Sequence, residues 1–139
     1  MENQAIFLPA AALVALTFGV ALLLLRARFR AAFRGQVNPG DFRYGESERV
    51  PPEARLPSRN YVNLLEMPVL FYVACVILYA IGAVDKAGLA LAWAYVACRA
   101  LHSLVHLTYN NVFHRLAAFA ASNVVLLVIW IRLVLAVVD

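Results

Sequence analysis

The sequence predicts an all-α integral membrane protein, a bundle of four membrane-spanning helices. Hydrophobic residues make up 64% of the chain and charged residues 14%, whereas soluble domains average about 45–50% and about 25%. The hydrophobic residues fall into four runs, each close to the roughly 20 residues that a helix needs to cross the hydrocarbon core. Most of the arginines lie between these runs. With 139 residues, the chain is expected to form one domain, residues 1–139.

The four runs give the expected helices and one long loop. The helices are expected at about residues 6–25, 61–81, 89–109 and 116–138. The first is not typical of a cleavable signal peptide, because basic residues follow its apolar stretch instead of preceding it. The polar segment of about residues 26–60 is rich in proline and glycine, and a loop of this length is often functional. We interpret it as a solvated linker or as a segment that partly folds over a pocket at the membrane surface.

The arginines also predict the orientation of the bundle. Eight of them lie between the first and second helices, and Arg115 lies between the third and fourth. The short connection between the second and third helices carries only Asp85 and Lys86, whose charges cancel. The positive-inside rule therefore places the arginine-rich loop in the cytoplasm and both termini in the periplasm. This orientation explains the net charge of +4 without a nucleic-acid partner, and the expected surroundings are membrane lipids.

Three polar residues form a stripe on the second helix. Arg59, Asn63 and Glu66 are spaced i, i+4, i+7, so their side chains lie on one helical face. A carboxylate within a membrane helix costs at least a few kcal/mol unless it meets a partner or water. Pro68 removes a backbone hydrogen bond and is expected to bend the helix near Glu66.

A second polar stripe lies on the third helix. Arg99, His102 and His106 are spaced i, i+3, i+7, and Tyr109 follows one turn later. We expect Arg99 to be the counter-ion of Glu66, because charges inside membranes tend to pair within the bundle. One alternative is that this ion pair only holds the two helices together. Both stripes lie toward the cytoplasmic side and their positive groups outnumber the carboxylate, which favours a pocket for a negatively charged ligand.

The two histidines also have the spacing of metal ligands. His102 and His106 are at i, i+4, as in helical zinc sites, and Glu66 is a candidate third ligand. The neighbouring Arg99 would repel a cation, so we expect no metal.

The fourth helix is plainer. Ser122 and Asn123 are expected to hydrogen-bond across helices. Arg132 is expected to snorkel to the far interface or to pair between subunits.

The polar residues of the second helix resemble a known signature. Arg, three residues, Asn, two residues and Glu, followed closely by Pro, is the pattern of the MAPEG family (membrane-associated proteins in eicosanoid and glutathione metabolism). Arg59, Asn63, Glu66 and Pro68 reproduce it, with the proline one residue nearer the glutamate than in mammalian members. The stretch of residues 63–72, Asn-Leu-Leu-Glu-Met-Pro-Val-Leu-Phe-Tyr, resembles the bacterial branch.

The resemblance extends to the third helix. The family carries an arginine there, with polar or aromatic residues three and seven positions later, and Arg99, His102 and His106 fill these places. Well-studied members often have tyrosines where this chain has the two histidines. The family's catalytic arginine follows the third helix by about two turns, and Arg115 lies at a matching distance.

The resemblance implies a homotrimer in the bacterial inner membrane, with glutathione sites between neighbouring subunits at the cytoplasmic face. Glutathione would be the co-substrate, and Arg115 would stabilise its thiolate. The residues that would bind glutathione are Arg28, Arg59, Asn63, Glu66, Arg99, His102, His106 and Tyr109.

Three functions remain open at this point. The first is a glutathione transferase or peroxidase that acts on small hydrophobic electrophiles or lipid hydroperoxides, which reach the thiolate from the bilayer. The second is a trimer that binds a ligand or lipid without catalysis. The third is a small four-helix exporter that exchanges protons for cationic compounds, which suits Glu66 but not the arginines beside it.

Overall fold

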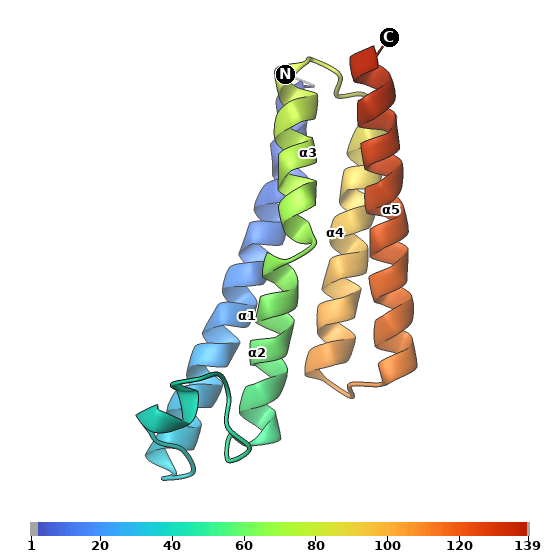
Figure 1. Ribbon diagram of the computed structural model, residues 1–139. Coiled ribbons are helices and arrows are strands. Elements are labelled where there is room, and N and C mark those ends of the chain that lie inside the picture. The colour runs from blue at the N-terminus through green and yellow to red at the C-terminus, as the bar shows by residue number, and fades with distance from the viewer. Residues whose placement is uncertain (1–2, 139) are drawn as a thin grey trace.

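The computed structural model describes residues 3–138, so residues 1, 2 and 139 of the expected domain lie outside the described part. The described chain is helical (Figure 1). Its elements are η1 (Asn3–Ile6), α1 (Phe7–Phe33), η2 (Pro39–Phe42), α2 (Pro52–Leu65), α3 (Pro68–Ala80), α4 (Lys86–Leu107) and α5 (Val112–Val138). Within these residues, four helical stretches are long and apolar enough to cross a membrane: Asn3–Phe33, Pro52–Ala80, Lys86–Leu107 and Val112–Val138.

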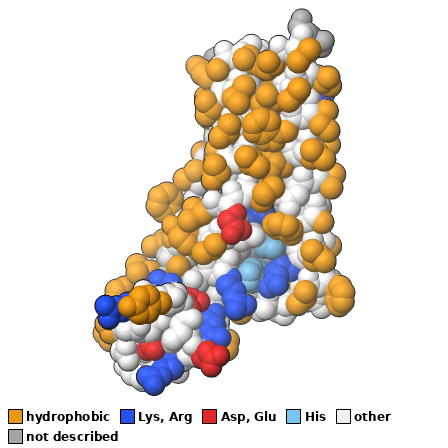
Figure 2. Space-filling model, in the orientation of Figure 1, with side chains coloured by type: hydrophobic (Ala, Val, Ile, Leu, Met, Phe, Trp, Pro, Cys, Tyr) orange, Lys and Arg blue, Asp and Glu red, His pale blue; other side chains and the backbone are white. Residues whose placement is uncertain are grey.

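The helices form two pairs that meet in one core. α1 packs along α2, and α4 packs along α5. Figure 1 shows η1 and the end of α5 at one end of the bundle, and the loop that holds η2 at the other. The Phe71 and Tyr95 rings stack at 4.6 Å between α3 and α4. Large hydrophobic side chains cover the outside of the bundle (Figure 2), as a surface that faces lipid requires.

The first helix is longer than expected. α1 continues past residue 25 to Phe33, because residues 26–33 contain arginine, alanine and phenylalanine and no helix breaker. Gly35 follows with a φ of 67°, a conformation that ends helices and suits glycine. α2 begins at Pro52, where proline is favoured in the first turn. The expected loop of residues 26–60 is therefore reduced to residues 34–51.

The second expected helix, residues 61–81, is two helices. α2 ends at Leu65, and the backbone of Glu66 leaves the helical region, with φ −89° and ψ −98°. Pro68 opens α3 and has no N–H to donate to the turn before it. The bend expected near Glu66 is confirmed, and it is a full interruption of the helix.

The hydrogen bond across helices expected for Ser122 was wrong, whereas Arg132 reaches the end of the bundle opposite η2, as snorkelling toward the far interface requires. The Ser122 hydroxyl donates to the Phe119 carbonyl of its own helix at 2.7 Å, and not across helices, because the carbonyls one turn back lie within reach of a serine side chain. The Arg132 guanidinium donates to the Asp85 carboxylate of the same chain at 2.7 Å. Asp85 also caps α4 by accepting from the Gly88 N–H.

The loop between α1 and α2 is folded, and Asp41 organises it. The Asp41 carboxylate accepts hydrogen bonds from the Asn38 N–H at 2.8 Å and the Ser47 hydroxyl at 2.9 Å. Val37 and Val50 are buried against the ends of α1 and α2. Residues 34–51 are therefore packed against the helices.

Acid is expected to loosen this loop. The hydrogen bonds from Asn38 and Ser47 lower the pKa of Asp41 below its usual value. Its contribution to stability is present above about pH 3.9, the pKa of an unfolded aspartate, and is lost as the pH falls through the lower folded pKa. Hydrogen exchange of residues 38–50, corrected for intrinsic rates, should show that protection is lost as the pH falls through the folded pKa of Asp41. The Ser47→Ala variant should lose protection at a higher pH, and identical profiles would contradict this account.

Candidate functional site

A groove at the loop end of the bundle contains four of the residues predicted from the sequence. It has a volume of about 480 Å³ and lies between α1, the folded loop and α2. Arg28 comes from α1, Arg59 and Asn63 come from α2, and Glu66 follows the end of α2. The full lining is Arg28, Phe42, Gly45, Glu46, Ser58, Arg59, Val62, Asn63 and Glu66.

The loop holds Arg28 in place. Its guanidinium lies 3.3 Å from the Glu46 carboxylate and 3.4 Å from the Ser58 hydroxyl. It also lies over the Phe42 ring, 4.8 Å from the centroid. Since Phe42, Gly45 and Glu46 of the loop form one wall of the groove, the interpretation in which the loop folds over a pocket is supported.

The ion pair expected between Glu66 and Arg99 was wrong. Glu66 is exposed at the break between α2 and α3, and it makes no ion pair within residues 3–138. Arg99 is fully buried, and its Nη2 donates to the Asn63 side-chain oxygen and, at 3.0 Å, to the Asn63 carbonyl. The helix break is the physical reason: the last carbonyls of α2 have no N–H partner within the helix, so one of them accepts from Arg99.

The Arg99 guanidinium also has N–H donors that lack an acceptor in the described part of the chain. Its guanidinium lies 5.8 Å from the centroid of the Phe119 ring. Within the described part of the chain, its Nε and Nη1 have no hydrogen-bond partner. Buried donors without partners cost about 1–3 kcal/mol each, so this position suits an acceptor-rich ligand or water. Asn63 connects it to the groove, because Asn63 both lines the groove and binds Arg99.

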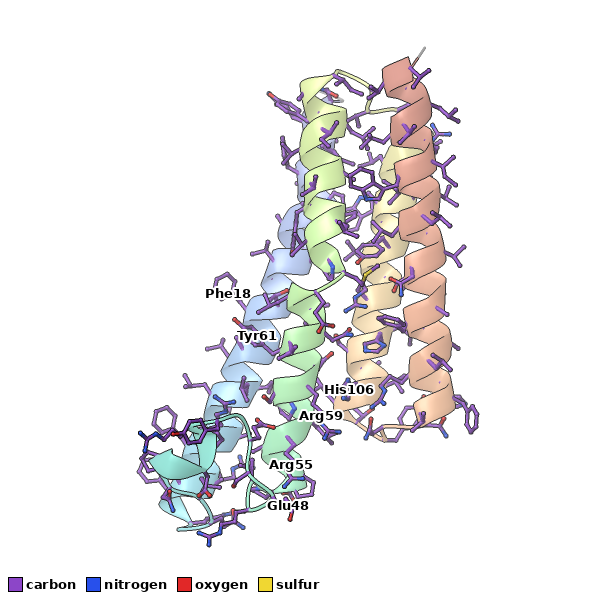
Figure 3. All side chains as sticks on the ribbon, viewed as in Figure 1. Phe18, Glu48, Arg55, Arg59, Tyr61 and His106 are labelled. Carbon is purple, nitrogen blue, oxygen red and sulfur yellow. The ribbon has the colours of Figure 1, made fainter. Side chains whose placement is uncertain are left out.

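The two histidines are buried between α2, α4 and α5. The His102 Nδ1 lies 3.1 Å from the Arg115 carbonyl. The His106 ring lies 5.7 Å from the His102 ring, edge to face, and is 5% exposed. Figure 3 shows His106 on α4 facing Arg59 on α2. In Figure 2, basic, acidic and histidine side chains gather on this face below the hydrophobic surface.

The structure adds a polar pair that the sequence reasoning missed. Asn60 is fully buried, and its side-chain oxygen accepts from the Ser103 hydroxyl at 3.1 Å. This pair joins α2 to α4 one turn from the bond between Asn63 and Arg99. The signal was present, because Asn60 precedes Asn63 by three residues and Ser103 follows Arg99 by four, so each pair shares a helical face.

Tyr109 lies in the turn between α4 and α5, and Arg115 lies in the first turn of α5. The Arg115 Nη1 donates to the Asn110 side-chain oxygen at 2.7 Å. Asn110 has a φ of 46°, which shapes the turn, and Asn111 accepts from two N–H groups at the start of α5. Tyr109 is exposed and pairs with His114 at 2.9 Å. Neither Arg115 nor Tyr109 lines the groove of Arg28 and Glu66 within a single chain.

The comparison with known proteins identifies a family for this chain. The model of the MAPEG family matches residues 6–135, nearly the whole chain. No curated protein and no solved structure matches the chain significantly. The matched span includes every helix that contributes to the groove and to the buried polar residues behind it. The chain therefore belongs to the MAPEG family, a family of glutathione-related membrane enzymes.

Proposed function

We propose that this protein is a glutathione transferase or peroxidase that acts on small hydrophobic electrophiles or lipid hydroperoxides. Its site would lie at the cytoplasmic membrane face of a homotrimer, and glutathione would be its co-substrate. The groove that contains two arginines, an asparagine and an exposed carboxylate carries the proposal.

The charges of the groove match those of glutathione. This tripeptide carries two carboxylates and one ammonium group. Arg28 and Arg59 offer planar guanidinium groups, which bind carboxylates well, and Glu66 offers a carboxylate for the ammonium. Glu66 and Arg59 are both exposed in the single chain, which is what a site completed by a neighbouring subunit requires.

Arg115 is the proposed catalytic residue. A cation near the cysteine sulfur of glutathione favours the thiolate form of that sulfur, which is the nucleophile. In conjugation, the thiolate attacks an electrophilic carbon and the leaving group departs with the bonding electron pair. In peroxidase chemistry, the sulfur attacks the outer peroxide oxygen and the O–O bond breaks, giving an alcohol after protonation and a sulfenic acid. A second glutathione then converts the sulfenic acid to the disulfide and water.

A second hollow supports a hydrophobic substrate. It has a volume of about 260 Å³ and lies between α1 and the interrupted helix of α2 and α3. Its lining is mostly apolar and includes Phe18 and Tyr61 (Figure 3). Leu65, the residue before Glu66, also lines it, so an apolar molecule in the bilayer can approach the end of the groove.

Removing the charge of Glu66 is expected to weaken glutathione binding by about 10–100-fold, because a hydrogen bond to a charged group contributes about 1.5–3 kcal/mol. Calorimetry on the detergent-purified protein would measure the affinity of wild type and Glu66→Gln. Glu48→Gln is a matched control, since Glu48 is an exposed carboxylate of the loop outside the groove. Saturable binding that is weakened only in Glu66→Gln would support the proposal. No binding at millimolar glutathione, or equal affinities in the two variants, would overturn it.

A further inference from the structure

Three arginines along the end of α1 form a stripe that the glutathione site does not use: two lie in the helix, and Arg34 is its C-cap. Arg26, Arg30 and Arg34 are spaced i, i+4, i+8, so they lie on one helical face. All three are exposed, and none forms an ion pair with a carboxylate in the part of the chain that the structure describes. They line a cleft of about 460 Å³ that does not include Arg28. Arg28 lines the separate groove of Glu66.

The other side of this cleft comes from three elements. The end of the loop provides Pro51, α2 provides Glu53, Ala54 and Pro57, and α4 provides Leu107. Glu53 is the acidic residue in the lining, against three arginines. The cleft is therefore strongly positive, and the planar guanidinium groups favour phosphate as a ligand.

The lengths of the helices place this cleft at the depth of the lipid headgroups. α4 has 22 residues, a length of about 33 Å, which just spans a hydrocarbon core of about 30 Å. Its last residue, Leu107, borders the cleft. Along α1, Arg26 lies about 28 Å from Phe7, so it too lies near the edge of a hydrocarbon core of about 30 Å. Figure 1 shows α1 and α2 continuing beyond the turn between α4 and α5.

Apolar side chains lie beside the arginines on the outer surface. Leu25, Phe29 and Phe33 share a shallow hollow of about 600 Å³ with the arginines of the stripe. Phe29 is 54% exposed and Phe33 is 87% exposed. Aromatic side chains are enriched at membrane interfaces, so the surface offers apolar contact beside the cleft.

We propose that Arg26, Arg30 and Arg34 bind the headgroup phosphate of an anionic phospholipid, whose acyl chains lie along Leu25 and Phe29. The three guanidinium groups line one cleft and outnumber its carboxylate, which suits an anionic headgroup. The hollow beside it takes the apolar part that a free phosphate lacks. This binding site is independent of the glutathione site.

Short-chain phosphatidylglycerol is a direct probe of this site. Its affinity for the detergent-purified full chain can be measured from the stability shift that a ligand of the native state produces. Each arginine near an anionic lipid strengthens binding about fivefold, so Arg26→Gln/Arg30→Gln is expected to weaken it about 25-fold. The matched control is Arg43→Gln/Arg49→Gln, which removes the same charge from exposed loop positions outside the cleft and should change affinity less than twofold.

Two further probes separate a lipid site from general attraction of anions. Short-chain phosphatidylcholine should bind at least tenfold more weakly than phosphatidylglycerol, because its headgroup is neutral overall. Inorganic phosphate should compete only at much higher concentrations, because it lacks the apolar part. Equal loss of affinity in the two double variants, no loss in either, or inorganic phosphate binding as tightly as the lipid would each overturn the proposal.

Discussion

Replacing Arg115 with alanine is expected to lower turnover with an electrophilic substrate by about 10²–10³-fold, the usual cost of removing one group that stabilises developing charge. Glutathione affinity is expected to stay within about twofold of wild type. The structure explains why the two effects should separate. His102 is bonded to the backbone carbonyl of Arg115, which alanine keeps, and the turn is shaped by Asn110 and capped by Asn111. The variant therefore loses a cation and little of the local fold.

The measurement is a steady-state assay with glutathione and a model electrophile, with calorimetry on the same preparations. Arg115→Lys is the informative companion, because lysine keeps the charge without the planar fork, and it should recover part of the turnover. If Arg115→Ala loses glutathione binding in proportion to its loss of turnover, then Arg115 binds glutathione and has no separate catalytic role.

Replacing Arg99 with alanine is expected to destabilise the bundle by about 2–4 kcal/mol and to abolish high-affinity glutathione binding. The variant leaves the Asn63 carbonyl and side-chain oxygen without their donor, and buried acceptors without partners are costly. Asn63 is also the residue that connects Arg99 to the groove. Without Arg99, the Asn63 side chain is no longer held in place, so the lining of the groove should change.

Unfolding in mixed micelles would measure the stability of Arg99→Ala. A double-mutant cycle with Asn63→Ala should show a coupling of at least about 1 kcal/mol, because the two side chains contact each other. Glutathione binding is measured at a temperature where each variant remains folded. Additive effects in the cycle, or wild-type affinity in folded Arg99→Ala, would mean that the link through Asn63 does not support the site.

The sequence predicted the all-α fold and the polar faces of the helices, because both depend on spacings between residues that are near one another in the chain. Apolar runs of about 20 residues and spacings of three or four residues follow from the dimensions of a helix and a bilayer. The break near Glu66 was also predictable, since it depends on the missing N–H of Pro68. These features need no knowledge of which helices pack together.

The partners of the polar residues could not be predicted in the same way. Spacing places Glu66 and Arg99 on faces of two helices, but it does not say that the break turns the carboxylate outward and supplies Arg99 with a carbonyl. The same limit applies to Arg132, whose partner Asp85 is fixed by the turn before α4. The length of α1 was underestimated because hydropathy ends at the arginines, whereas helix propensity continues to Phe33.

The interruption at Glu66 has a consequence for how this sequence can change over generations. A continuous helix would occupy the carbonyl of residue 63 with the N–H of residue 67, so the buried guanidinium of Arg99 has its acceptor because Pro68 is present. A mutation that repairs the helix removes the backbone acceptor of a buried charge, and a mutation that removes the charge leaves the opened backbone without its donor. We therefore expect the effects of Pro68 and Arg99, which belong to different helices, to depend on each other, so that replacing either one alone lowers stability.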